Sequence, residues 1–128
     1  MTCLLDTHTF LWLAAEPEKL SPAVQVIVEQ GDAKLLLSAA SSWEIALLVK
    51  LGRIELAEAP DIFIPSAMQA LQITPLSIGF ATAIAAASLP LIHRDPFDRI
   101  LAAEALRSNI TLLSKDEIIH KYGVRVVW

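Results

Sequence analysis

Short, continuous apolar runs are the feature of this sequence that most constrains its fold. "TCLL" at 2–5, "AKLLLS" at 33–38 and "ITLLS" at 110–114 show no polar alternation, which is typical of strands buried on both faces. The segments between these runs have helical spacing. Buried strands that alternate with helices predict an α/β fold, with a central parallel sheet of about four to five strands and helices on both faces.

Several of the connecting segments carry helix signals. Ser21 and Pro22 open a helix that closes at Gly31, and Ser41 and Glu44 have the spacing of a capping box. Further helices are predicted at 7–16, after Asp61, at 78–90 as a buried helix, after Asp95 and from Lys115. "ITPLS" and "VRVVW" are predicted as additional strands.

Composition narrows the class of protein. A chain of 128 residues is long enough for one domain, residues 1–128, with its own core. The single cysteine, Cys3, excludes an internal disulfide and a zinc site built on cysteine pairs, and it is typical of a reduced, cytoplasmic protein. The longest low-polarity run, "FATAIAAASLPLI", is shorter than the ~20 residues of a membrane helix. A net charge of −4 means that any nucleic-acid binding depends on local basic residues and metal.

Acidic residues follow the predicted strands at points that a parallel sheet brings to one edge. Asp6 ends the first run, Glu44 lies in the first turn after the second, Asp95 and Asp98 open a helix, and Asp116 follows "TLLS". Each of them alone is explained by helix capping. Two carboxylates ~4 Å apart, however, repel by roughly 4 kcal/mol at an effective dielectric constant near 20, so a cluster favours a bound cation. Oxygen ligands favour Mg²⁺ or Mn²⁺, which support hydrolysis of phosphodiesters.

Basic and polar residues lie beside these acids. Arg94, Arg99 and Lys115 either guide a phosphate backbone or only neutralise the acids. Ser114 either caps a helix or orders a metal-bound water through its hydroxyl. The three histidines share no metal-ligand spacing and are expected at surface or capping positions: His8, His93 and His120.

Four segments of the chain resemble PIN-domain ribonucleases, in particular the VapC-type toxins of bacterial toxin–antitoxin pairs. The segments are "LLDTHTFLW", "SAASSWEIALLVKLGRIEL", "HRDPFDRILAAEAL" and "TLLSKDEII". The resemblance spans nearly the whole chain and implies a single PIN domain with a Rossmann-like parallel sheet. It further implies an acidic site that binds Mg²⁺ or Mn²⁺ and hydrolyses RNA, a cognate antitoxin protein that blocks this site, and a homodimer.

The resemblance also assigns roles to the acids. It implies that Asp6, Glu44, Asp98 and Asp116 are the catalytic metal-binding residues, while Asp95 starts the helix and supports the site. Two alternatives remain open. A phospho-accepting receiver domain fits the lysine after "TLLS", but it requires a pair of acids after the first strand, where "LLDTHT" has one. A non-enzymatic interaction module, whose acids only cap helices, predicts no divalent-metal binding.

Overall fold

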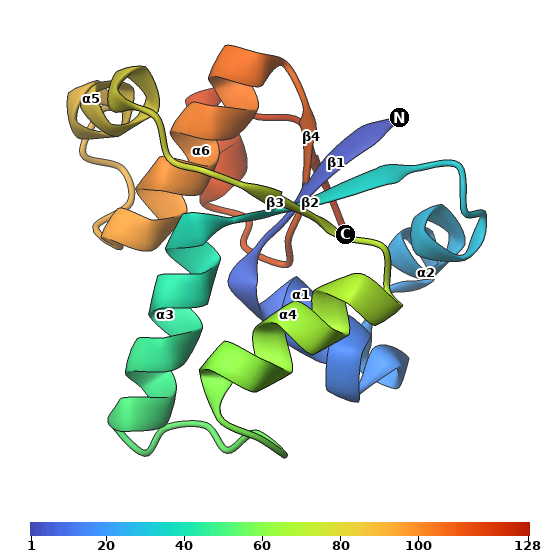
Figure 1. The fold of residues 1–128 in the computed structure, drawn as a ribbon. Coiled ribbons are helices and arrows are strands. Elements are labelled where there is room, and N and C mark those ends of the chain that lie inside the picture. Colours follow the sequence, from blue (N-terminus) through green and yellow to red (C-terminus); the bar gives the residue numbers. More distant parts are fainter.

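The computed structural model describes the whole chain, Met1–Trp128, as a parallel sheet surrounded by helices (Figure 1). The strands are β1 (Thr2–Leu5), β2 (Lys34–Ser38), β3 (Thr74–Leu76), β4 (Thr111–Leu113) and β5 (Val126–Val127). The α-helices are α1 (Thr7–Ala15), α2 (Pro22–Glu29), α3 (Ala39–Lys50), α4 (Pro60–Ala70), α5 (Phe80–Ser88) and α6 (Pro96–Ser108). Two short 3₁₀ helices complete the chain, η1 (Pro17–Lys19) and η2 (Ile119–Tyr122).

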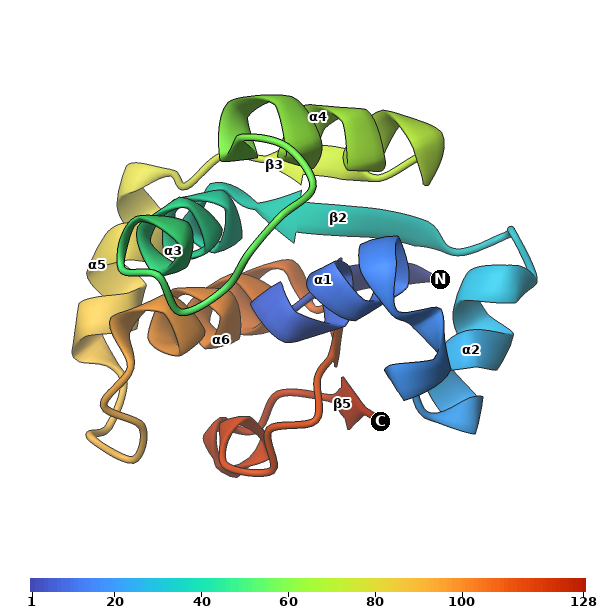
Figure 2. The same ribbon diagram turned by 90° about the horizontal axis from the view of Figure 1, so that it is seen from below.

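The sheet has the order β3-β2-β1-β4-β5, and every neighbouring pair is parallel. Figure 2 shows this order from β3, beside α4, to β5 at the opposite edge. The predicted α/β class and parallel sheet are therefore confirmed. Since all strands point the same way, the segments that follow β1 and β4, the two central neighbours, leave the sheet at one common edge.

Alternate side chains of each strand enter two separate cores, one on each face of the sheet. Cys3 and Leu5 of β1 pack with Phe10 of α1 and with side chains of α2, α3 and α4. Leu4 enters the other core with Leu101 of α6 and with side chains of η2. Burial on both faces explains why the strand sequences are continuously apolar.

Two predicted helix starts differ from the structure. α3 begins at Ala39 because Ser38, the last residue of β2, already caps it through a hydrogen bond from Ala40 N to Ser38 Oγ (3.1 Å). Ser41 is therefore inside the helix, and Glu44 lies in its second turn. The helix predicted from Lys115 is only the short η2, because the Asp116 carboxylate first accepts the Ile118 N–H and holds a turn.

The segment predicted as a buried helix, residues 78–90, forms α5 but is largely exposed. α5 packs beside α6, not directly on the sheet, and only Thr82 and Ala86 of this helix are buried (Figure 1). Phe80 and Ile84 are 92% and 66% exposed. The prediction of burial is wrong because an apolar composition does not determine which faces of a helix find a neighbour. None of the helices combines the length and apolar character needed to cross a bilayer.

Candidate active site

Asp6 is fixed at the carboxyl end of β1 by hydrogen bonds to both of its oxygens. It caps α1, with Oδ1 accepting from Thr9 N (2.7 Å), and Oδ2 accepts from Ser114 Oγ (2.5 Å). Ser114 directly follows β4, and Asp6 N donates to Leu113 O of that strand (3.1 Å). The carboxylate is only 8% exposed, so its position is set by the ends of two neighbouring strands.

Asp95 and Asp98 occupy different positions at the start of α6. Asp95 is the N-cap: its Oδ1 accepts from Phe97 N (2.9 Å), and Pro96 takes the first helical position. Asp98 lies in the first turn, where the helix dipole favours a negative charge. Helix capping therefore explains the presence of Asp95. The carboxylate of Asp98 does not cap the helix and lines a cavity together with Asp6.

The surroundings of Asp98 disfavour its charged form. The pKa of Asp98 is raised to about 8, first by burial and then by the neighbouring carboxylates of Asp95, Glu44 and Asp116. These acids come from α3, from the cap of α6 and from the loop after β4, so residues far apart in sequence meet around one carboxyl group. A divalent cation would relieve both the desolvation and the repulsion.

Glu44 reaches the same neighbourhood from α3. Thr7, in the first turn of α1, donates a hydrogen bond from Oγ1 to Glu44 Oε1 (2.5 Å), and its Oγ1 lies 3.1 Å from Ser41 Oγ. Burial raises the pKa of Glu44, and the Thr7 hydrogen bond opposes this rise by favouring the carboxylate. Thr7 thus ties the carboxyl end of β1 to α3.

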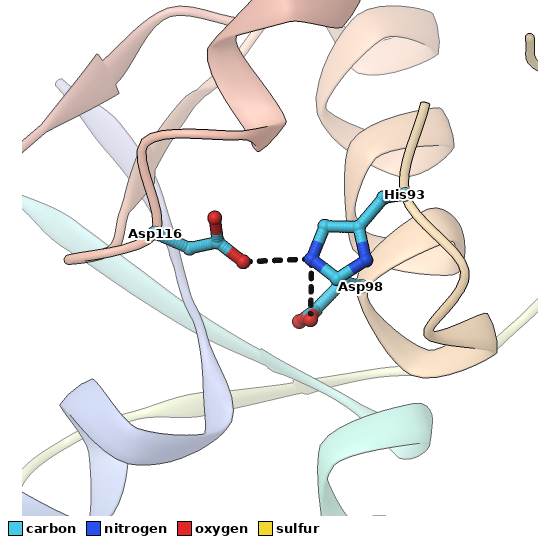
Figure 3. A group of neighbouring side chains, drawn as sticks. All are labelled: His93, Asp98 and Asp116. Atoms are coloured by element: carbon cyan, nitrogen blue, oxygen red, sulfur yellow. Dashed lines mark hydrogen bonds and ion pairs between the residues drawn. The ribbon is translucent and has the colours of Figure 1, made fainter. Parts of the chain in front are cut away.

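Asp116 and His93 complete the cluster, and the contribution of His93 was missed in the sequence. The Nε2 atom of His93 lies 2.7 Å from Asp116 Oδ2 and 3.2 Å from Asp98 Oδ2 (Figure 3). Ligand-type atoms of these three residues all lie within 4.8 Å of one another. The expected surface or capping position of His93 is therefore wrong. The available signal was its place five residues before Asp98, in a loop that turns into α6.

Three of the four predicted acids line one cavity. This cavity, of about 320 Å³, is lined by Asp6, His8, Trp12, Asp98, Lys115 and Asp116. Glu44 is outside the lining and approaches the site through Asp98 and Thr7. A larger cavity, of about 480 Å³, lies between α1, α2 and β2, and its walls are mostly aliphatic, without a cluster of acids. The acidic cavity, of about 320 Å³, is therefore the candidate site, because it brings three of the four predicted acids together.

The predicted basic residues divide into two groups. Arg94 and Lys115 are exposed, and Lys115 lines the acidic cavity. Arg99 is buried (8% exposed), and its guanidinium donates to backbone carbonyls at the end of α5 and in the loop that follows. The three shortest of these bonds go to Ala86 O (2.8 Å), Leu89 O (2.9 Å) and Pro90 O (2.9 Å). The prediction that Arg99 contacts phosphate is therefore wrong, because its guanidinium binds the chain between α5 and α6.

Carboxylate oxygens dominate the atoms available to hold a metal. Asp6, Asp98 and Asp116 present them at the cavity, Glu44 is the next carboxylate, and the only nitrogen among the clustered ligand-type atoms belongs to His93. This chemistry suits Mg²⁺ or Mn²⁺ better than zinc, which prefers nitrogen and sulfur ligands. The donor set therefore fits the cation that the sequence predicts.

Comparisons with known proteins bear on the family and the fold of the chain. A family model described as PIN domain matches residues 3–124. Ribonuclease VapC22 of Mycobacterium tuberculosis is 33% identical over 124 residues, which cover 94% of this chain and 92% of that protein.

Two solved structures have the same fold at low sequence identity. The structure of VapBC2 from Rickettsia felis, bound to a DNA fragment from its promoter, aligns with a TM-score of 0.72 at 12% identity, over 99% of this chain and 98% of that chain. FitAcB from Neisseria gonorrhoeae aligns with a TM-score of 0.63 at 20% identity, over 98% and 96% of the two chains. These two likenesses concern the arrangement of the sheet and helices.

Proposed function

The chain belongs to the PIN-domain family, and from this premise we propose that it is a metal-dependent endoribonuclease, the toxin of a VapC-type toxin–antitoxin pair. A relative at 33% identity is named a ribonuclease, and residues 1–128 are proposed as a single PIN domain. Family membership removes the receiver-domain alternative. A module whose acids only cap helices leaves the cluster around Asp98 unexplained, because Asp98 itself caps nothing.

The crowding of carboxylates around Asp98 carries this proposal. Folding places this group among three other acids at the edge of a polar cavity, at a cost that shows in its raised pKa of about 8. Proteins keep such arrangements mainly at functional sites. A bound Mg²⁺ or Mn²⁺ accounts for the arrangement, since it compensates the repulsion and uses the oxygen donors that are present.

We propose that Asp6, Asp98 and Asp116 hold the cation, with Glu44 as the fourth catalytic acid. When bound, the cation supplies Lewis-acid stabilisation of the phosphodiester and lowers the pKa of water. Thr9 and Ser114 keep the Asp6 carboxylate oriented through its two hydrogen bonds. Thr7 holds Glu44 beside the site through a hydrogen bond to Oε1. Asp95 supports the site by fixing the start of α6.

Two exposed cations are proposed to contact the RNA backbone. Lys115 lies in the wall of the acidic cavity, and Arg94 precedes the cap of α6. Because the chain has a net charge of −4, affinity for RNA comes from these local contacts and from the cation. Ser114 is proposed as a supporting residue that acts through Asp6 and does not touch RNA.

Protein partners form a further part of the proposal. A solved structural neighbour from Klebsiella pneumoniae is a toxin–antitoxin complex, and we propose a cognate antitoxin for this chain. A homodimer is proposed because large apolar side chains are left in water: Trp43, Phe80, Ile84 and Leu91 are 62%, 92%, 66% and 89% exposed. A cytoplasmic location follows from the proposed substrate, cellular RNA.

The proposal is tested by RNA cleavage. Purified chain, free of antitoxin, is incubated with total cellular RNA and Mg²⁺ or Mn²⁺, with EDTA in a parallel sample. Asp98→Asn is compared with Asp61→Asn, a matched control because Asp61 is an exposed aspartate in the first turn of α4. We expect metal-dependent cleavage by the wild type and the control, and only the EDTA background from Asp98→Asn. Cleavage that persists in EDTA, full activity of Asp98→Asn, or no cleavage by folded wild type contradicts the proposal.

A further inference from the structure

His93 joins two carboxylates that reach the site from separate parts of the chain. Asp98 belongs to the first turn of α6, and Asp116 to the loop after β4. The imidazole lies between them, with Nε2 within hydrogen-bond distance of Asp116 Oδ2 (2.7 Å) and Asp98 Oδ2 (3.2 Å) (Figure 3). The three side chains have limited access to water, with 14% of His93, 19% of Asp98 and 28% of Asp116 exposed. An interaction at this degree of burial is stronger than one on the open surface.

We propose that His93 is a positioning residue that holds Asp98 and Asp116 at the spacing the cation needs. This inference rests on the proposed metal-dependent function of the site. His93 was not predicted from the sequence to belong to the site. In this inference it binds the carboxylates and does not bind the metal.

A backbone contact determines which ring nitrogen carries the hydrogen. Asp95 N donates to His93 Nδ1 (3.2 Å), so Nδ1 accepts and bears no hydrogen. The neutral ring then has its hydrogen on Nε2, the atom that faces the two carboxylates. A protonated ring nitrogen has no lone pair to offer a metal. The geometry therefore makes His93 a hydrogen-bond donor to Asp116, and the same Nε2–H lies close to Asp98; both carboxylates are proposed metal ligands.

The backbone of His93 is held as firmly as its ring. His93 N donates to Tyr122 Oη (2.6 Å), and His93 O accepts from Arg99 Nη1 (3.3 Å). Arg99 Nη1 also lies 3.3 Å from Tyr122 Oη, so η2 and α6 hold the histidine together. The buried Arg99 thereby acts on the site indirectly, by fixing the loop that carries His93. A histidine at a merely exposed position would not need this support.

Three substitutions at His93 test whether the site needs a hydrogen-bond donor at the position of Nε2. Alanine removes the donor. Glutamine replaces it, because the amide nitrogen of glutamine reaches about as far as Nε2, whereas asparagine reaches only as far as Nδ1. Mn²⁺ affinity is measured by calorimetry on the antitoxin-free chain without RNA. We expect His93→Ala and His93→Asn to weaken Mn²⁺ binding by about 10-fold or more, and His93→Gln to stay within about threefold of wild type.

Two controls accompany this series. His120→Ala removes an exposed histidine whose Nδ1 contacts only the Glu117 carbonyl, and it should bind Mn²⁺ as wild type does. The ring ¹⁵N shifts of His93 in the metal-free wild type should report a neutral ring with its hydrogen on Nε2. If His93→Ala does not fold, the Mn²⁺ affinities of His93→Gln and His93→Asn still test whether the donor at the position of Nε2 is needed.

Several outcomes would overturn the inference. One is wild-type Mn²⁺ affinity in His93→Ala or, if that variant does not fold, in His93→Asn. Another is an affinity of His93→Gln for Mn²⁺ as low as that of His93→Asn. A hydrogen on Nδ1 of His93, or no Mn²⁺ binding by the wild type, would also overturn it. Failure of the proposed function gives a different result. A chain that binds Mn²⁺ in a His93-dependent way and cuts no RNA would overturn the ribonuclease proposal and leave the role of His93 standing.

Discussion

Asp6 and Asp98 line the same cavity from two different elements, and the protein surrounds them in opposite ways. Asp6 accepts hydrogen bonds on both oxygens, from Thr9 N and Ser114 Oγ. Asp98 faces other carboxylates, and its pKa is raised to about 8 by burial and by those neighbours. The fold compensates Asp6 with two hydrogen bonds, whereas Asp98 has only the nearby Nε2–H of His93, shared with a second acid, to offset three neighbouring carboxylates in the absence of a cation.

This difference separates two requirements of a metal site. Asp6, as a proposed ligand, is positioned in advance, because the same hydrogen bonds that orient it also cap α1 and join β1 to β4. Asp98, the second proposed ligand, is repelled by neighbouring carboxylates, and a cation that relieves this repulsion would bind more favourably as a result. Substitutions at the two positions should therefore both impair the proposed activity, yet change the stability of the metal-free protein in opposite directions.

The largest expected effect on stability comes from Asp6→Ala. The variant loses the cap of α1 and leaves the buried hydroxyl of Ser114 without its acceptor, so the free energy of unfolding should fall by about 2–3 kcal/mol. Urea unfolding in EDTA at pH 7 measures this change, with Asp61→Ala as the control at an exposed position. Wild-type stability in Asp6→Ala would mean that the hydrogen bonds of Asp6 do not contribute to folding, and the comparison with Asp98 would fail.

Asp98→Asn should have the opposite effect, and this effect should depend on pH. The pKa of Asp98 is about 8 in the folded protein and about 3.9 in the unfolded chain. Between these values the folded state binds more protons than the unfolded state, so the contribution of Asp98 to stability falls as pH rises from about 4 to about 8. Asparagine does not ionise and avoids this loss.

Thermal unfolding in EDTA at several pH values tests the effect of Asp98→Asn. At pH 8.5 the variant should unfold at a temperature at least about 5 °C above that of wild type, the shift that roughly 1 kcal/mol produces in a domain of this size. Near pH 4 the difference should be small, because the wild-type carboxyl is then protonated in the folded state and still about half protonated in the unfolded chain. An equal gain at both pH values would show that the charge of Asp98 is not its cause.

The sequence predicted the parts of this molecule that depend on local pattern. Strands buried on both faces are continuously apolar, and acids placed after parallel strands must meet at one edge. Asp6 after β1 and Asp116 beyond β4 are of this kind, and the structure brings both to one cavity. Their roles as metal ligands remain a proposal.

Other features depend on contacts that no local pattern encodes. Ser38 and Ser41 are both suitable caps, and the choice between them depends on where β2 ends. Arg99 was expected to face phosphate, yet its guanidinium meets the carbonyls of residues 86–93 because α5 ends beside α6. His93 belongs to the site only because the loop held by Arg99 folds back over α6. The positions of Arg99 and His93 in particular depend on how α5, α6 and the loop between them pack together.

The smallest of the three stability effects is expected from Ser114→Ala, which makes the surroundings of Asp6 more like those of Asp98. This change removes the hydrogen bond to Asp6 Oδ2 and the acceptor of Asp116 N, but the cap on Thr9 N remains. The free energy of unfolding should fall by about 1 kcal/mol, less than in Asp6→Ala. Urea unfolding of both single variants and the double variant gives the coupling between Asp6 and Ser114, expected at about 1 kcal/mol. Additive losses would show that the short contact between these two side chains contributes nothing to stability, and Asp6 would then be compensated by its helix cap alone.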